Sequence, residues 1–321
     1  MNRPQKHHYV PQMLLRRFAN DRGMLWAYDK HTDRVFETGP DNVAGIRDFY
    51  TVSGEQPYII ERAFSHLEGR VAPVLERIRA EVSLASVSSD EREILDFFAA
   101  LQMQRTVHPR EVMTQLTEML REKLARLGHD GPEIEDFASG GVDEADARAQ
   151  ELLASAIAST VHFANKDLLI LEWGGESAKF IGDNPIAKQN HRSFGLYGNL
   201  GIAQPGIEIY LPISASLTLN WMCPSFRESM ASTAETAQRI GNEDESLRER
   251  VAALSQRPTM FLKAVETGVA YPIEPANLEN LNALQVRFSE RFVFAQADDF
   301  ELIRRMLRDH ADYRKGPRLT F

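Results

Sequence analysis

The chain has 321 residues and a formal net charge of −9, with apolar and charged fractions that are ordinary for a globular protein. The acidic balance argues against a protein that coats nucleic acid through a general basic excess, although it leaves room for a local basic cleft. No apolar run approaches the roughly 20 residues that span a bilayer, and the first residues lack the apolar core of a signal peptide. The single cysteine, Cys223, fits a reducing compartment. We therefore expect a cytoplasmic protein without a membrane partner.

The first half of the sequence predicts short strands followed by long helices. Residues 24–28 and 34–37 flank a turn-like segment and predict a β-hairpin, and residues 49–52 predict a further strand. From about 58 to 165 the apolar residues recur with helical spacing. A break is expected near Pro109, because proline removes a helical hydrogen bond.

The second half returns to strands and then to helices. Strands are predicted at 168–173, 178–182, 207–212, 217–222 and 293–295, the first two as a hairpin. Helices are predicted near 232–256, 275–288 and 298–313. This pattern predicts an α+β fold that is mostly helical with a small, mainly antiparallel sheet. We expect a single domain over 1–321, divisible into sub-regions 1–165 and 166–321.

A polar segment, KHHYVPQ over residues 6–12, stands near the N-terminus. Imidazoles are the side chains most easily tuned to proton transfer near neutral pH. In an extended chain His7 and His8 point their rings to opposite faces, so we expect one ring to enter a given site. The alternative is a pair of exposed or structural histidines. The segment lacks the His-Glu-x-x-His pattern of a zinc site.

Charged groups also occur where the helical pattern calls for apolar ones. Arg105 projects from the middle of the apolar face of the helix near 89–108, and Gln102 flanks it. A buried cation needs a carboxylate, a phosphate or a water-filled cleft. Glu61 and Glu68 lie seven residues apart along the border of the preceding helix, and Glu68 is the simplest partner for Arg105. The alternative is a purely structural ion pair between helices.

A third polar motif lies at a predicted strand end, in residues 180–186. Asp183 and Asn184 precede a proline there. Such residues commonly cap a turn by bonding their own backbone. The functional interpretation is a carboxylate and an amide that are presented from a strand end.

Together these motifs resemble the DUF4238 family, a mainly bacterial family of unknown function. The matching residues are KHHYVPQ (6–12) with LRRF (15–18), Glu61 and Glu68, FAALQMQRT (98–106) with Arg110, FIGDNP (180–185), LPIS (211–214) and NLN (280–282). The resemblance covers roughly 7–300, with Gly182 where we expect a serine. It implies a shared polar site without naming a reaction.

We expect this site to combine residues from separate segments. The expected catalytic residues are His7, His8, Glu68 and Asp183, and the expected substrate-binding residues are Tyr9, Gln12, Gln102, Arg105, Arg110 and Asn184. The first hypothesis is a hydrolase of a phosphate-containing substrate, a nuclease or phosphodiesterase, with nucleic acid or a nucleotide as its partner. Arg105 would bind phosphate, and Glu68 or Asp183 would orient a histidine or hold a divalent metal such as Mg or Mn.

Two other hypotheses use the same residues. The chain could be a non-catalytic sensor of a nucleotide or small molecule, or the recognition module of a bacterial defence or toxin system. Alternatively, the charged residues form a structural ion network that holds the N-terminal segment onto the helices. The sequence fixes neither a metal nor an oligomeric state.

Overall fold

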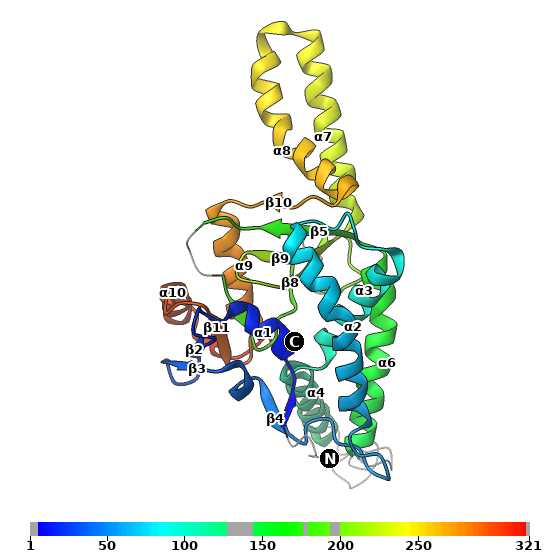
Figure 1. Ribbon diagram of the computed structural model, residues 1–321, viewed down its shortest axis with the longest axis vertical. Helices are drawn as coiled ribbons and strands as arrows, with labels where there is room; N and C mark the ends of the chain where they lie inside the picture. The colour runs from blue at the N-terminus through cyan, green and yellow to red at the C-terminus, as the bar shows by residue number, and fades with distance from the viewer. Residues whose placement is uncertain (1–5, 127–143, 176–178, 193–199, 319–321) are drawn as a thin grey trace.

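The computed structural model describes residues 6–126, 144–175, 179–192 and 200–318 (Figure 1). Its centre is a five-stranded sheet in which β10 and β5 run parallel and all other neighbours run antiparallel. In spatial order the strands are β10 (Tyr271–Pro272), β5 (Asp167–Glu172), β9 (Leu217–Met222), β8 (Ile207–Pro212) and β7 (Ala187–Asn190). The predicted α+β class is confirmed.

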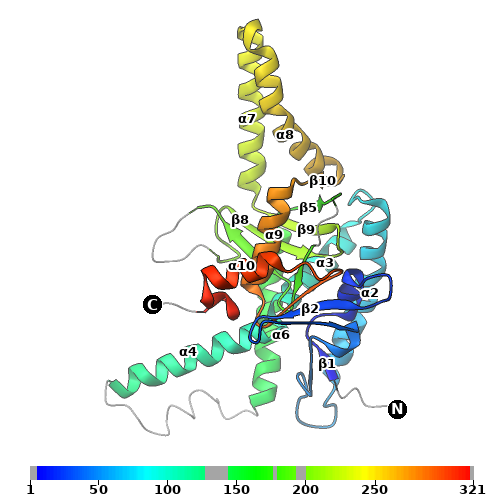
Figure 2. The ribbon, with the colours of Figure 1, turned by 90° about the vertical axis from the view of Figure 1, so that its left-hand side faces the viewer.

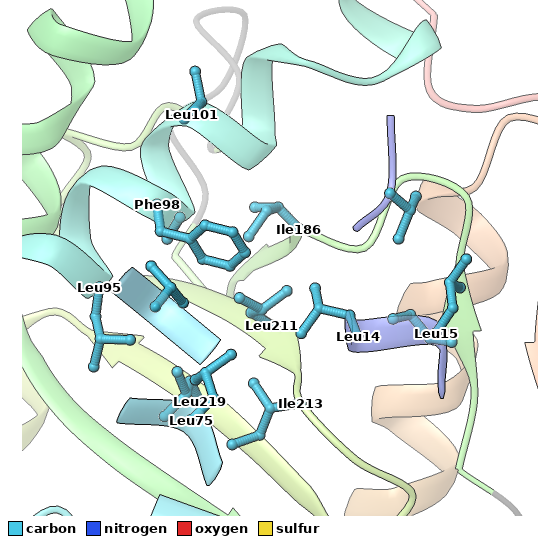
Figure 3. Close-up of a cluster of buried hydrophobic side chains, with 14 of the residues drawn as sticks. Leu14, Leu15, Leu75, Leu95, Phe98, Leu101, Ile186, Leu211, Ile213 and Leu219 are labelled. Atoms are coloured by element: carbon cyan, nitrogen blue, oxygen red, sulfur yellow. The ribbon is translucent and has the colours of Figure 1, made fainter. Parts of the chain in front are cut away.

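Helices cover both faces of this sheet, so that β8 and β9 are buried at every position. One face packs against the apolar sides of α2, α3 and α6, and Figure 3 shows Phe98 of α3 close to Leu211 and Ile186. The other face packs against α9. The bounds are α2 (Ile59–Glu81), α3 (Ser89–Gln104), α6 (Glu144–Ala164) and α9 (Pro275–Phe288).

A four-stranded antiparallel sheet lies beside the central one and carries the last helix. Its order is β3 (Arg34–Thr38), β2 (Leu25–Asp29), β11 (Phe292–Ala295) and β6 (Ile181–Gly182). The helix α10 (Glu301–Asp309) packs on it through Ile303 and Leu307. A separate antiparallel pair joins β1 (Lys6–His8) to β4 (Gly45–Arg47), and the short helix α1 (Gln12–Leu15) follows β1 in the chain.

Two parts project from this body (Figure 2). The helices α7 (Pro224–Glu243) and α8 (Arg248–Thr267) form a hairpin that extends far beyond the sheets. The helix α4 (Val107–Arg126) leaves the body in another direction. The described chain has no helix that is both long and apolar enough to cross a membrane.

The helix α3 begins where a capping box predicts it should. Ser88 accepts a hydrogen bond from the backbone of Glu91, whose side chain bonds back to Ser88. The helix ends at Gln104 and α4 begins at Val107, so the predicted break near Pro109 is confirmed. The break places Arg105 at the C-terminal end of α3, where the chain changes direction.

Three predicted elements are wrong. The predicted strand at residues 49–52 does not form: residues 49 and 50 lie in a turn that begins at Asp48, which has a positive φ of 55°, and residues 51 and 52 belong to no regular element. The proposed hairpin over 168–182 does not form, since β5 pairs with β9 and β10 while β6 belongs to the other sheet. The helix expected near 232–256 is a helical hairpin that turns at residues 244–247.

The largest hydrophobic cluster joins the two predicted sub-regions. It extends in sequence from Tyr9 to Phe294 and includes residues on both sides of position 165. The division into one domain with two sub-regions stays a prediction.

Candidate functional site

The first histidine of the N-terminal motif is buried and bonded to the turn at Tyr50. The strand β1 pairs with β4 so that His7 lies opposite Ile46. The His7 ring has no exposed surface, and its Nδ1 accepts a hydrogen bond of 2.9 Å from the backbone N–H of Tyr50. The two rings are parallel, with centroids 5.8 Å apart. His7 therefore anchors the turn at Tyr50 to β1.

The second histidine has a partly exposed ring. The His8 Nε2 lies 3.2 Å from Nε2 of Gln12 and 3.3 Å from the carbonyl oxygen of Asp41. Partial burial lowers the pKa of His8, although the Asp41 carbonyl opposes this shift. Gly45 leaves room for the side chains of β1, because a Cβ atom there would lie 2.6 Å from Cε of Lys6 and 3.2 Å from the His8 ring. Partial burial thus favours the neutral form of the His8 imidazole.

Arg105 joins three segments of the chain. Its Nη1 donates to Oε1 of Glu68 at 2.7 Å, and its Nη2 donates to the carbonyl oxygen of His8 at 2.7 Å. The guanidinium also lies 4.6 Å from the centre of the Phe64 ring. The pairing of Glu68 with Arg105 expected from the helix patterns is present. Both terminal nitrogens of Arg105 are thus occupied by the protein.

Glu61 stands beside this pair on α2. Burial raises the pKa of its carboxyl group, the positive charge of Arg105 lowers it, and the negative charge of Glu68 raises it further. One carboxyl oxygen, Oε2, is buried without a hydrogen-bond partner among the residues that the structure describes. Glu61 therefore retains a proton more readily than an ordinary glutamate.

The neighbouring motif residues hold the backbone. The Gln102 amide donates to the carbonyl oxygen of Tyr9 at 2.8 Å, and the Tyr9 ring is buried. Gln12 accepts a hydrogen bond of 2.6 Å from Arg16. The Arg110 guanidinium lies 3.4 Å from the centre of the Phe49 ring and donates to the carbonyl oxygen of the same residue.

Asp183 and Asn184 lie in a different, fully buried environment. The Asp183 carboxylate accepts backbone N–H groups from residues 290, 291 and 292 at 2.7 to 2.9 Å. Burial raises the pKa of Asp183 to about 6, although these donors favour the charged form. Asn184 accepts a bond from Thr106 and donates to the carbonyl oxygen of Phe288. These side chains therefore bind segments that are distant in sequence, and not their own turn as the capping interpretation predicted.

The structure thus sorts the predicted residues into three groups. His8, Gln12, Glu68 and Arg105 are linked by direct contacts at the partly exposed face of β1, which we call the His8 cluster. His7, Tyr9, Gln102 and Arg110 hold the surrounding backbone. Asp183 and Asn184 hold the segment before β11. The expected functional roles of these residues stay predictions.

A comparison with known families identifies the family of the chain. Residues 6–299 match the family model described as a protein of unknown function, DUF4238. The chain belongs to the DUF4238 family. No curated protein and no solved structure matches it.

The departure at Gly182 has a packing consequence in this DUF4238 chain. The Gly182 N–H donates to Oε1 of Gln285 at 2.8 Å. A Cβ at this position would lie 3.0 Å from the Gln285 carbonyl oxygen and 3.0 Å from Cβ of Ser289. A serine here would therefore require the end of α9 to shift.

A buried ionic cluster around Glu290 was not anticipated from the sequence. The Glu290 carboxylate binds His108 at 2.5 Å and Arg318 at 2.8 and 2.9 Å. Burial raises the pKa of Glu290, but the hydrogen bonds from His108 and Arg318 outweigh it and hold this pKa at about 2. Lys30 lies nearby and donates to three backbone carbonyls at 2.6 to 2.8 Å. The cluster joins residues more than 250 positions apart in sequence, so no local pattern indicates it.

The side-chain geometry of the described residues does not support the expected site for a divalent metal. Within them, no group of three or more histidine, cysteine, aspartate or glutamate residues is placed to hold a metal ion. His8 and Glu68 offer at most two donors from the predicted set. What the His8 cluster can do by itself is proton transfer beside a fixed ion pair.

Proposed function

We propose that this DUF4238 protein is a hydrolase of a phosphate-containing substrate, a nuclease or phosphodiesterase, whose reaction centres on His8. The observation that carries the proposal is the bridge made by Arg105, which ties the Glu68 carboxylate to the backbone of His8. It joins three segments of the chain at the backbone of the residue that carries this partly exposed imidazole. Convergence of polar groups on a titratable side chain is typical of catalytic sites.

The protonation states suit acid–base chemistry. The lowered pKa of His8 makes it a proton acceptor near neutral pH, and the raised pKa of Glu61 makes it a proton donor. His8 would take a proton from the water that attacks phosphorus, and Glu61 would protonate the oxygen that leaves. One P–O bond forms and one breaks, and the two proton transfers balance.

In this proposal the phosphate is bound by cations other than Arg105. Because Arg105 is occupied, its role here is to position His8 and Glu68. Lys6 and Arg16 both bond to Asp41 beside the His8 ring, and Arg47 lies opposite Lys6 in β4. These cations form a rim at the protein surface. An open rim suits an extended phosphodiester more than an enclosed small molecule.

The test is an activity assay with a matched histidine control. Purified protein is incubated with RNA, DNA and nucleotides, with and without Mg or Mn. We expect His8→Ala to reduce cleavage by about 100-fold or more, the usual loss for a general base. His66→Ala, which removes an exposed histidine of α2, should leave cleavage unchanged. If both variants cleave like the parent protein, the proposal is wrong.

A second function, binding without turnover, is favoured by the occupied state of Arg105 and Asp183. Residues that are held by contacts within the protein can shape a site without reacting. The chain would then be a nucleotide or small-molecule sensor, or a recognition module in a bacterial defence or toxin system. Thermal-shift screening separates the two: a ligand that stabilises the protein and is recovered intact supports the sensor.

A further inference from the structure

The helix α6 lacks charged side chains over most of its length. Residues 152–164 read LLASAIASTVHFA and contain no aspartate, glutamate, lysine or arginine. A helix that is apolar on every side is normally buried on every side. The helix α6 nevertheless lies at the edge of the body, on the right-hand side of Figure 1. Its position and its composition therefore disagree in a single copy of the chain.

One side of α6 is firmly packed on the body. Ala156 and Phe163 have no exposed surface, and the Phe163 ring meets the Trp221 ring edge-on, with centroids 5.4 Å apart. Leu152 and Leu153 contact the largest hydrophobic cluster. These contacts fix the helix in place. The opposite side is therefore a rigid surface, which a partner can bind without first ordering it.

That opposite side carries an exposed apolar stripe. Ile157 is 65 % exposed and Val161 is 54 % exposed. Ala154, Ala158 and Ala164 are exposed beside them. These five residues, which we call the α6 stripe, recur at spacings of three and four and so share one face of the helix. Contiguous exposed apolar surface of this kind marks an interaction site.

The helix α2 shows that exposure to water does not by itself produce such a surface. It packs on the same face of the central sheet, and its exposed positions include Arg62, Arg70 and Glu76. Charged side chains are the ordinary covering of a helix face that meets water. The core of a protein interface is instead depleted of charge. The α6 stripe therefore has the composition of a surface that another protein chain covers.

The stripe is complementary in shape to a second copy of itself. A two-fold axis that crosses α6 near Ile157 and Ala158 would pair two copies of the helix antiparallel. This pairing sets Val161 of one copy against Ala154 of the other. It also sets Ile157 of one copy against Ala158 of the other. Each large side chain thus meets a small one, and small side chains at the contact let two helices approach closely.

The polar groups that border the stripe are complementary in the same arrangement. Glu151 and His162 are eleven residues apart, about 20° around the helix, so they border one side of the stripe. In an antiparallel two-fold pair this side meets the same side of the other copy. Glu151 then lies beside His162 of the second copy, whose ring N–H can donate to the carboxylate. At the two ends of the stripe, the exposed amides of Gln150 and Asn165 meet.

We infer that this protein forms a two-fold symmetric dimer through the α6 stripe. From Gln150 to Asn165 the contact is about 23 Å long, at 1.5 Å per residue. A single helix pair of this length covers less than the roughly 800 Å² per partner of a standard stable interface. We therefore expect a reversible dimer with a dissociation constant in the micromolar range. The inference does not depend on the proposed hydrolase.

The experiment is sedimentation velocity of the full chain from about 1 µM to about 300 µM, a range that brackets micromolar dissociation constants. We expect the mass to rise from monomer to dimer across this range. Ile157→Glu places two like charges beside the two-fold axis and should weaken the dimer at least about tenfold. Leu254→Glu is the matched control, because it makes a similar change at a 71 % exposed residue of α8. It should leave the dimer unchanged, and thermal unfolding should show that both variants are folded.

A charge reversal tests the antiparallel arrangement. Glu151→Lys removes the acceptor for His162, and His162→Glu sets two carboxylates against each other, so each should weaken the dimer. The double variant restores a pair of opposite charges and should recover most of the affinity. A double variant that is as weak as the two single variants overturns the antiparallel pairing.

Two results overturn the inference as a whole. One is a chain that stays monomeric at about 300 µM, where a micromolar dimer is mostly formed. The other is a dimer that withstands Ile157→Glu. Leu116→Glu, at a 42 % exposed residue of α4, locates the contact in that case. If it dissociates the dimer and Ile157→Glu does not, the interface lies on α4 and the assignment to α6 is wrong.

Discussion

The His8 cluster and the segment around Asp183 contain similar residues in contrasting states. Asp183 is 3 % exposed and accepts three backbone N–H groups, so its carboxylate has no remaining access to a substrate. Glu68 has a side chain that is 25 % exposed and faces a single cation. His8 beside it is also partly exposed. Carboxylates from two motifs thus have different surroundings: Asp183 binds the backbone in the interior, whereas Glu68 borders solvent.

The contrast shows how a polar motif should be judged. A charged residue in a family motif can serve the fold as well as a reaction, and the number of backbone groups that it satisfies distinguishes the two. Buried donors left without a partner are expensive, so a carboxylate that satisfies three of them is under structural constraint. We therefore expect substitutions in the Asp183 segment to affect stability, and those at His8 to affect chemistry.

The largest expected effect is that of Asp183→Ala. The variant leaves three backbone N–H groups of residues 290–292 without acceptors in the interior, and we expect a loss of roughly 3 to 6 kcal/mol in the free energy of unfolding. Urea denaturation measures this loss. Asp183→Asn keeps one acceptor oxygen and should lose less. A stable Asp183→Ala protein would contradict the structural role.

A smaller loss is expected from Arg105→Met. The change removes the donors to Glu68 and to the His8 carbonyl, and we expect a loss of about 2 to 4 kcal/mol. Glu68→Gln should cost about 1 kcal/mol, because its side chain is partly exposed and solvent screens the pair. Hydrogen exchange should show faster exchange in β1 for both variants. Unchanged exchange in β1 would mean that Arg105 does not hold this strand.

A pH effect is expected from the buried region that precedes the Asp183 segment. Lys179 is 1 % exposed and hydrogen-bonds to Thr218, and burial lowers its pKa from 10.5 to about 7. Between pH 7 and 10.5 the unfolded chain therefore binds a proton that the folded chain does not, so stability rises with pH across this window. Lys179→Met should reduce that rise. Parallel stability curves from pH 7 to 10.5 for the parent and the variant would contradict the lowered pKa.

The smallest effect on stability is expected from His8→Ala. The ring has only partly exposed contacts with Gln12 and Asp41, and we expect a change of less than about 1 kcal/mol. His7→Ala, by contrast, opens a buried space beside Tyr50 and should destabilise the protein by more than His8→Ala. Thermal unfolding of the pair gives the comparison directly. A larger loss for His8→Ala would assign the structural role to the wrong histidine.

Local patterns predicted those elements whose signals lie within one segment. The hairpin of β2 and β3, the strands β8 and β9, and the helix α9 each have apolar spacing and turn residues close together in the sequence. The strand β6 was assigned to the wrong partner, because its pairing with β11 joins residues more than 100 positions apart. Strand pairing over such distances depends on how the helices pack.

The sequence likewise predicted only part of the candidate site. Helical phase indicated that Arg105 needs a carboxylate and that Glu68 is the nearest candidate, and the two are in contact. It could not indicate that the second nitrogen of Arg105 binds the carbonyl oxygen of His8, since backbone acceptors have no signature in side-chain pattern. Helical phase also could not predict that Asp183 binds the backbone, because its three donors are N–H groups of residues 290–292, which are distant in sequence.

By itself the sequence determined the α+β class, the break between α3 and α4 and the pairing of Arg105 with Glu68, and the resemblance of its motifs indicated the family. The class, the break and the pairing follow from periodicity, turn chemistry and the cost of burying a charge, all of which act through the nature of the side chains. The tertiary structure alone decided which polar residue stays in contact with solvent. That depends on which backbone groups surround each side chain, and these are supplied by chain segments distant in sequence.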